Sequence, residues 1–311
     1  MLNTPLVAKH TFEEGEQSHL LFSDAGDRLN KRFQLAKPFA DLMGRVYLDS
    51  RIRKKIHRLK KDQPSLTIGE THCHSNFSDG VHSVQSILKR AAWLGLDYVV
   101  ITDHLIPGKV KLESILACFE AQDQCVSELD EKNKPVQVYP AFEISALEGH
   151  LVIILDPKYF SREKILDISL QFSDFDGEFF SMLDVIPRIH PFGGISIVAH
   201  PEKNLTYPIG ASIKWVKDNP IGLVDGVEDI STAHGYQKDY SRELGLASIG
   251  SSDDHFNLLV GTAVTAYDGS LHSDLISAVK AKQTEAIIVE NSLQPLLAAA
   301  RQVMSIGSNK R

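Results

Sequence analysis

Seven short apolar runs, each followed by polar or helical sequence, constrain the fold of this 311-residue chain more than any other feature. The runs are rich in Val and Ile and cover residues 66–75, 97–104, 136–145, 150–157, 194–201, 223–231 and 246–255. Residues 83–94 and 112–129, which lie between runs, place their apolar side chains at helical spacing. Strands that are apolar throughout and alternate with helices are typical of a parallel sheet covered by helices.

The spacing of the runs favours a barrel over an open sheet. A closed eight-unit barrel takes about 250 residues, roughly 31 a unit, so the 225 residues from 66 to 290 fit seven units. An open doubly wound sheet is the alternative, but its first strand usually leads into a Gly-rich turn, and here that turn is THCHSNFSDG. We predict an α/β fold with a distorted seven-stranded barrel at 66–290, a helical N-terminal extension at 1–65, and a C-terminal helix and tail at 291–311.

Nearly all candidate site residues stand at the carboxyl ends of these predicted strands. They are His72, His74, Asp79, Asp103, His104, Glu143, His200, Asp253 and His255, whereas His150 stands at the start of a run. Parallel α/β barrels build their active sites at the carboxyl ends of their strands. Histidine and carboxylate side chains gathered there indicate a metal site.

The HxH pair offers two metal ligands from one strand. Because side chains alternate along a strand, His72 and His74 point to one side and Cys73 to the other. We therefore expect Cys73 to be a small buried hydrophobe and not a ligand. Asp253 and His255 are predicted to share a strand face in the same way.

Each candidate also has an ordinary structural explanation. Asp79 lies in the turn-forming triplet SDG, and His104 could be a core histidine that ends a strand. Glu143 is harder to explain, because AFEIS surrounds it with apolar residues, and a buried carboxylate is costly without a cation or hydrogen-bond donors. Six histidines and three carboxylates at one barrel mouth favour a multinuclear metal site.

The motifs THCHSNFSDG, VVITDH, FEIS, IVAHP and GSSDDH, in this order, resemble those of the PHP (polymerase and histidinol phosphatase) family. The resemblance covers about residues 67–290. It implies a (β/α)7 barrel of the PHP type, two or three divalent ions such as Mn, Zn or Fe, and hydrolysis of phosphoric esters. The ligands that it implies are His72, His74, Asp79, His104, Glu143, His150, His200, Asp253 and His255, with Glu143 as the bridge between ions.

The expected mechanism follows from this metal chemistry. Adjacent divalent ions lower the pKa of a bound water, so that a metal-activated hydroxide attacks phosphorus. The leaving alkoxide takes its proton from a metal-bound water or from His255. Asp253 and Asp103 are the other catalytic candidates, and Lys203 is the candidate for binding the substrate phosphate.

The charge balance favours a small substrate. The chain has 33 Lys and Arg against 40 Asp and Glu, a formal charge of −7, so we expect a phosphorylated metabolite or nucleotide instead of long nucleic acid. Residues 51–61 hold seven Lys or Arg, which we interpret as the solvated face of a packed helix. Alternatively, this helix serves an exonuclease or oligonucleotide phosphodiesterase. An amidohydrolase and a metal-stabilised, non-catalytic binding module are further alternatives.

The remaining features concern the compartment and the other histidines. The chain has three cysteines, its first residues show no secretory signal, and its apolar runs are too short to cross a bilayer. We therefore expect a cytoplasmic protein without a membrane partner, and the oligomeric state stays open. The other seven histidines, among them His234, are expected at surface or capping positions.

Overall fold

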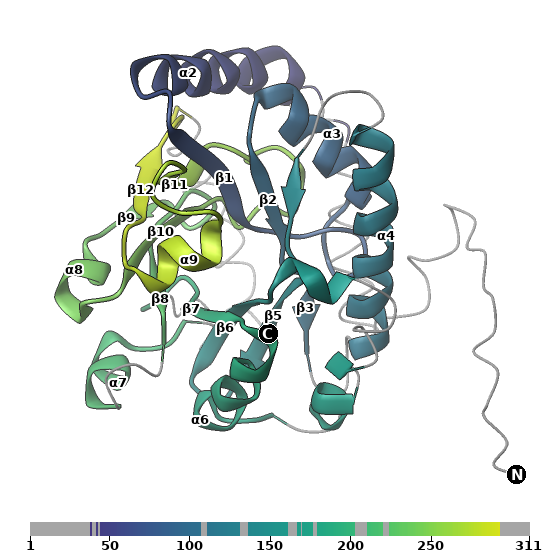
Figure 1. Ribbon diagram of the computed structural model, residues 1–311, viewed down its shortest axis with the longest axis vertical. Coiled ribbons are helices and arrows are strands. Elements are labelled where there is room, and N and C mark those ends of the chain that lie inside the picture. Colours follow the sequence, from purple (N-terminus) through teal and green to yellow (C-terminus); the bar gives the residue numbers. More distant parts are fainter. Residues whose placement is uncertain are drawn as a thin grey trace, which may run out of the picture.

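The computed structural model has a mixed α/β fold in which helices lie against two β-sheets (Figure 1). It describes residues 38, 42, 44–106, 111–130, 136–160, 167–168, 170–176, 179–202, 210–219 and 224–292. Lys203, most of the predicted C-terminal helix and tail, and much of the predicted N-terminal extension lie outside these residues. The predicted α/β class is confirmed, and each of the seven predicted runs contains at least one strand.

The strands follow the order β12-β11-β1-β2-β4 in one sheet and β10-β8-β7-β6-β5-β3 in the other, where β9 also pairs with β8. Their bounds are β1 Leu66–Cys73, β2 Tyr98–Ile101, β3 His104–Leu105, β4 Gln137–Val138, β5 Ala141–Ala146, β6 Gly149–Ile154, β7 Ile195–Val198, β8 Gly226–Ser231, β9 Tyr236–Gln237, β10 Ala247–Ser251, β11 Ala263–Asp268 and β12 Glu285–Ile288. The strands β11 and β12 follow the last predicted run and were not expected.

The strand pairings do not confirm the predicted seven-stranded (β/α)7 barrel. The pairs β1–β2, β2–β4, β3–β5, β7–β8 and β8–β10 are parallel. The pairs β1–β11, β11–β12, β5–β6 and β6–β7 are antiparallel. Among the described strands, the pairings form two sheets that do not close into one ring. An apolar run shows that a strand is buried but not its direction, so the expectation of a wholly parallel sheet was wrong.

Main-chain hydrogen bonds join the two sheets where β1 and β10 end. The amide of Asp253 donates to the carbonyl of His72 at 2.8 Å, and the amide of His74 donates to the carbonyl of Asp254 at 2.9 Å. Cys73 and Asp254 form an isolated parallel bridge at the same place. The end of β1 and the segment after β10 are therefore held side by side.

The helices cover the outer faces of the sheets (Figure 1). Their bounds are α2 Asp49–Asp62, α3 Val84–Leu94, α4 Leu112–Asp130, α6 Met182–Val185, α7 Ile213–Asp218, α8 Tyr240–Leu244 and α9 Leu275–Lys280. A π-helical segment, Gly44–Leu48, leads into α2, and short 3-10 turns lie at Pro157–Phe160, Ser173–Asp176, Ile186–Arg188 and His190–Phe192. None of the helices in the described part of the chain combines the length and the hydropathy that a bilayer crossing requires.

The helix α3 confirms the periodicity of residues 83–94. It starts where the hydroxyl of Ser83 accepts a hydrogen bond from the amide of Ser86, and it ends at Gly95, whose φ of +87° lies in the left-handed region. All five residues of the predicted apolar face are buried: Val84, Ile87, Leu88, Ala91 and Leu94. The N-terminal end of α3 thus follows directly on the loop after β1.

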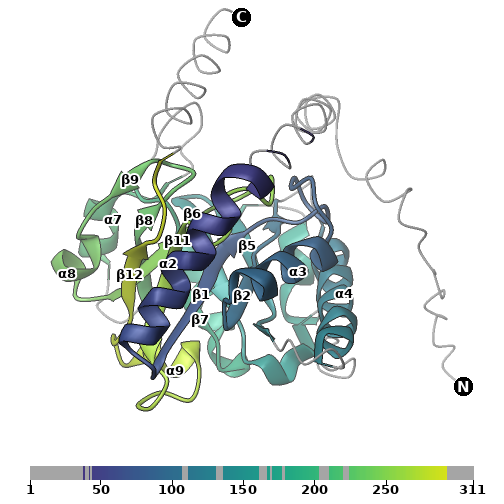
Figure 2. The same ribbon diagram turned by 90° about the horizontal axis from the view of Figure 1, so that it is seen from above.

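The helix α2 is the basic helix expected at residues 51–61. Ile52 and Ile56 are buried in the same apolar core as Ile68 of β1, and the helix runs along that strand (Figure 2). Its Lys and Arg side chains are mostly exposed. The packed helix with a solvated charged face is therefore confirmed. The boundary proposed at residue 65 stays a prediction, but α2 and β1 share one core.

An ion pair also fastens α2 to the end of β12. The carboxylate of Glu290 lies 3.0 Å from Arg51 Nε and 3.4 Å from Lys55 Nζ. Burial by itself would raise the pKa of Glu290. The hydrogen bonds from the Arg51 side chain and from the amide and hydroxyl of Ser292 outweigh burial and lower this pKa to about 2.

We expect Glu290→Gln to lower the free energy of unfolding by about 1 kcal/mol at pH 7, because the basic partners are half exposed. Since the folded-state pKa lies below that of an unfolded Glu, this contribution is complete above pH 4.5 and is lost as the pH falls toward 2. Denaturant unfolding of both proteins at pH 7 and pH 2.5 measures the difference. A difference that persists at pH 2.5 contradicts the assignment, and Glu285→Gln is the exposed-carboxyl control.

Candidate metal centre

The end of β1 supplies the first two candidate ligands, as the HxH spacing predicts. His72 Nε2 and His74 Nε2 lie 3.1 Å apart, and both rings are buried. The sulfur of Cys73 points the other way, toward the carbonyl of Val100 at 3.6 Å, and the residue belongs to the apolar core. The predictions for His72, His74 and Cys73 are confirmed in their geometry.

The loop after β1 carries Asp79 to the same place. Asp79 lies 3.9 Å from His74 Nδ1, 3.5 Å from His104 Nε2 and 3.2 Å from His255 Nε2. Gly80 follows it because a Cβ at that position would lie only 2.4 Å from the carbonyl oxygen of His74. Asp79 therefore lies in a turn, as the SDG triplet predicts, and this turn places its carboxylate in the cluster.

Asp103 has a different environment from the other candidates. Its carboxylate accepts hydrogen bonds from the amide of Ser75 at 2.8 Å and from the hydroxyls of Ser75 and Ser78 at 2.5 and 2.6 Å. The thiol of Cys118 also donates to it at 3.1 Å. Asp103 thus ties down the loop that carries Asp79, and it lies outside the candidate ligand groups.

Strand pairing brings the next three side chains together. His104 and Glu143 are register partners in the parallel pair β3–β5, and Ser145 and His150 are partners in the antiparallel pair β5–β6. Because β6 runs opposite to β5, the start of β6 lies at the end of β5. This reversal explains why His150, alone at the start of an apolar run, still reaches Glu143 at 2.9 Å.

Two candidate ligands sit on a left-handed backbone. His200 has a φ of +27° and Asp253 a φ of +50°. Such a backbone costs about 1–3 kcal/mol for a residue other than glycine, and it concentrates at functional sites. β10 ends at Ser251, so the expectation that Asp253 and His255 share a strand face was wrong. The turn sends Asp253 toward His74, at 3.1 Å, and His255 toward Asp79.

His234 is the site residue that the sequence analysis missed. It follows β8 and lies 2.6 Å from Asp253 Oδ2, and its ring centroid is 4.5 Å from that of His200. Its side chain is only 9% exposed, so the expected surface or capping position was wrong. Its place just beyond the end of a buried strand, as with the other candidates, is the signal that could have found it.

The oxygen Oε2 of Glu143 tests whether the cluster fits metal ions. This buried oxygen has no hydrogen bond within the described residues, yet it lies 3.3 Å from His72 Nε2, 3.5 Å from His74 Nε2 and 3.0 Å from His104 Nδ1. Tetrahedral ligands about 2.1 Å from an ion are about 3.4 Å from one another. The imidazole nitrogens lie at about these distances from Glu143 Oε2 without forming hydrogen bonds to it, as ligands that share a metal ion do. The donor set therefore fits metal ions.

Within the described residues, four groups of side chains could each hold a metal ion. Each residue of a group offers one ligand atom, and these atoms all lie within 4.8 Å of one another. The groups are His74–Asp79–His104–His255, His72–His74–Asp253, His104–Glu143–His150 and His200–His234–Asp253. All nine predicted ligands occur in them, with His234 as a tenth. Their binding of metal stays a prediction, but the structure brings all of them together.

The charges of neighbouring groups outweigh the effect of burial on the pKa at Glu143, His104 and His255. Burial raises the pKa of Glu143, but three neighbouring imidazoles hold it well below its ordinary value. Burial likewise disfavours protonation of His104 and His255, yet Asp79 raises their pKa values to about 9 and about 10. The buried His74 faces these two imidazoles, and its pKa falls to about 4. Ionised carboxylates suit metal binding, whereas His104 and His255 would have to release their protons to ligate an ion.

A second carboxylate orients the first ligand. Glu228 Oε1 lies 2.7 Å from His72 Nδ1 and accepts a hydrogen bond from the hydroxyl of Ser251, also at 2.7 Å. Its other oxygen accepts from the amide of His200 at 2.7 Å. With Nδ1 engaged by Glu228, the Nε2 atom of His72 faces the cluster. Such outer carboxylates fix the tautomer and orientation of ligating histidines.

A family model described as PHP-associated matches residues 233–284, from the segment with His234 to the turn before β12. This segment holds Asp253 and His255, which lie among the candidate ligands. The resemblance to the PHP family is confirmed. The match covers the C-terminal part of the PHP-like region only, and no curated protein matches the chain.

Several solved structures are similar to this PHP-like chain. A two-domain protein from Bacteroides vulgatus with a predicted PHP-like metal-dependent phosphoesterase is 18% identical, with a TM-score of 0.47 over 72% of this chain and 66% of that chain. PsfC from Pseudomonas syringae is 16% identical, with a TM-score of 0.44 over 78% and 98%. An endonuclease Q complex with a duplex is 14% identical, with a TM-score of 0.43 over 70% and 57%. These low scores assign neither activity nor substrate.

We expect Glu228→Gln to weaken metal binding about 10- to 100-fold while the protein stays folded, because His72 loses the charge that orients it. Competition with a chromophoric chelator measures the affinity, and circular dichroism checks the fold. Glu243→Gln on α8, which removes an exposed carboxylate, is the control. Unchanged affinity in Glu228→Gln would show that Glu228 only packs beneath the cluster.

Proposed function

We propose that the protein is a metal-dependent phosphoesterase of the PHP type. The observation that carries the proposal is the buried Glu143 carboxylate, which is surrounded by imidazoles from several strands and has one oxygen without a hydrogen bond in the described structure. A buried charge of this kind requires cations. The resemblance of the motifs and the PHP-associated match support the assignment.

Two or three divalent ions, of Mn, Zn or Fe, fit the mixture of histidine and carboxylate donors. We assign the nine ligands predicted from the motifs to these ions: His72, His74, Asp79, His104, Glu143, His150, His200, Asp253 and His255. When bound, the ions supply an activated water and neutralise charge on the phosphoryl oxygens. Glu143 would be the bridging carboxylate, since its two oxygens face different imidazoles.

The chain's own residues hold this arrangement in place. Glu228 orients His72, and Asp103 anchors the loop that brings in Asp79, so we assign Asp103 a positioning role instead of direct catalysis. The side chains of Asp79 and His255 are each about one-fifth exposed, which places them at the open side of the cluster. His255 can donate a proton to the leaving group only when it does not ligate an ion, so its two proposed roles are alternatives.

The substrate that we propose is a small phosphorylated metabolite or nucleotide. The candidate ligands are at most 22% exposed, so the cluster lies recessed in the fold and is reached from its Asp79–His255 side. Such a recessed site suits a terminal phosphate better than the middle of a duplex. Lys203 stays a candidate for the substrate phosphate outside the described residues.

We expect the purified protein to hold two or three equivalents of transition metal and to hydrolyse an aryl phosphate with added Mn. Elemental analysis measures the metal, and release of the aryl alcohol measures turnover. A strong chelator should stop turnover, and Mn should restore it. Bound metal without turnover on phosphomonoesters, phosphodiesters or amides would instead support the non-catalytic module, whereas turnover on amides alone would support an amidohydrolase.

Replacing central ligands tests the site directly. We expect Asp253→Asn and His74→Ala to lower turnover at least 10³-fold and to remove at least one equivalent of metal. Asn is chosen at Asp253 because it tolerates the left-handed backbone there, so loss of charge is separated from strain. Full activity in either variant would refute the assignment. His272→Gln is the control, because this half-buried histidine just before α9 lies outside the candidate ligand groups.

His234 should hold Asp253 in its ligating position, because the two side chains are 2.6 Å apart. We expect His234→Gln to weaken metal binding about 10-fold with a smaller effect on the Michaelis constant. Chelator competition and steady-state kinetics give the two values. An unchanged affinity together with a raised Michaelis constant would place His234 against the substrate instead.

A further inference from the structure

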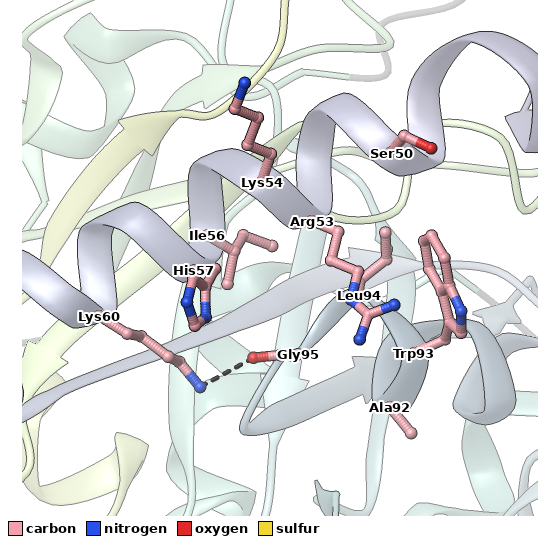
Figure 3. A pocket seen from close by; sticks show the side chains of 10 residues that line it. All are labelled: Ser50, Arg53, Lys54, Ile56, His57, Lys60, Ala92, Trp93, Leu94 and Gly95. Atoms are coloured by element: carbon pink, nitrogen blue, oxygen red, sulfur yellow. Dashed lines mark hydrogen bonds between the residues drawn. The ribbon is translucent and has the colours of Figure 1, made fainter.

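A groove lies between the basic helix α2 and the C-terminal end of α3 (Figure 3). Its volume is about 600 Å³. From α2, Arg53, His57 and Lys60 extend toward Trp93 and Gly95, which end α3. The eleven residues of α3 span about 16 Å, so this groove is separated by the length of a helix from the loop that carries Asp79.

The charge around the groove is opposite to that of the rest of the chain. The helix α2 carries seven Lys and Arg against two Asp, whereas the whole chain has a formal charge of −7. Lys60 is paired with Asp97 at 2.6 Å. Arg53, Lys54, Arg58 and Lys61 are exposed and form no ion pair with any described residue. A concentration of cations on an acidic protein attracts an anion to this place.

Trp93 adds an aromatic surface beside these cations. Its side chain is 41% exposed, and the guanidinium of Arg53 lies over its ring at 4.7 Å. Lys89, four residues earlier on α3, is exposed on the same face of the helix. A flat aromatic ring and a guanidinium plane are the surfaces on which bases stack, and the nearby cations suit a phosphate.

The packing of α2 argues against a lipid surface as the partner. A membrane-bound amphipathic helix inserts its apolar face among the acyl chains. In α2 that face consists of Ile52, Ile56 and Leu59, of which the first two are buried in the protein core and Leu59 packs partly buried against it. Cations with a single stacking ring fit a ligand that combines phosphate with an aromatic base.

We propose that this groove binds a nucleotide unit, with its base against Trp93 and Arg53 and its phosphate near His57 and Lys60, in the positive field of α2. The unit belongs either to a single strand or to a free nucleotide, since both present the same chemistry. The groove is a binding site distinct from the metal centre. Its occupancy does not depend on hydrolysis.

The test compares binding by the full-length protein and by a charge-reversed variant. Fluorescence anisotropy follows a labelled twelve-nucleotide oligo(dT), and calorimetry follows AMP. We expect Arg53→Glu/Lys54→Glu to weaken binding at least 30-fold and Trp93→Ala to weaken it about 10-fold, with Trp93→Phe restoring most of the loss. The matched control is Lys214→Glu/Arg242→Glu, which changes the net charge equally on α7 and α8 and should bind as the original protein does.

Hydrolysis of the aryl phosphate is measured in the same proteins. We expect it to be unchanged in the groove variants, so a failure of the proposed phosphoesterase would not be mistaken for a failure of this site. If the oligonucleotide binds tightly and AMP does not, the groove is a site for single strands. If AMP binds as tightly as the oligonucleotide does per nucleotide, the groove is a site for free nucleotides.

Three results would overturn the proposal. The first is that neither ligand binds the original protein at low salt. The second is that both groove variants bind as well as the control, or that binding is lost in Asp253→Asn instead. The third is that vesicles with phosphatidylserine bind in an Arg53- and Lys54-dependent manner while the oligonucleotide does not.

Discussion

The carboxylate of Glu143 lies in the middle of the strand β5, fully buried, and much of the surrounding structure serves to compensate its charge. Histidines from β1, β3, β6 and the end of β7 converge on it. In a low-dielectric interior a lone carboxylate would destabilise the fold, and the surrounding imidazoles together with the proposed metal ions would remove this cost. Because β7, β6, β5 and β3 are consecutive neighbours in one sheet, the imidazoles from β7, β6 and β3 reach the carboxylate on β5.

A second layer of buried acids supports the first. Glu228 engages His72 and the amide of His200, while Asp103 binds the loop of Asp79. Glu70 accepts hydrogen bonds from the amides of Ser252 and Gly261, next to the turn that presents Asp253. The buried carboxylates thus have two structural roles. Some face the cluster as candidate ligands, and others hold the loops through backbone amides, where hydrogen bonds to a charged acceptor are strong.

The two proposed functional regions lie at opposite ends of α3 and differ in their electrostatic character. The candidate metal centre is recessed and built from strand ends, so its precision depends on the sheets. The groove is open and built from two helices, so it offers charge and one stacking surface but few fixed contacts. Because α2 is anchored by Ile52, Ile56 and the Glu290 ion pair, the helix itself keeps a fixed position beside Trp93. The basic helix therefore belongs to the fold and also presents a surface to solvent.

Local patterns determined a large part of this protein. The alternation along β1 determined that His72 and His74 face one way and Cys73 the other, the helical spacing determined the buried face of α3, and the ordered motifs identified nine side chains that the structure gathers. Strand direction was decided only in the tertiary structure, because an apolar run is the same in either direction. The reversal of β6 brings His150 to Glu143, the turn after β8 brings His234 to Asp253, and a left-handed backbone aims Asp253 at His74. These contacts depend on hydrogen bonds between segments far apart in the chain, such as Asp253 to His72, and no local periodicity encodes such pairings.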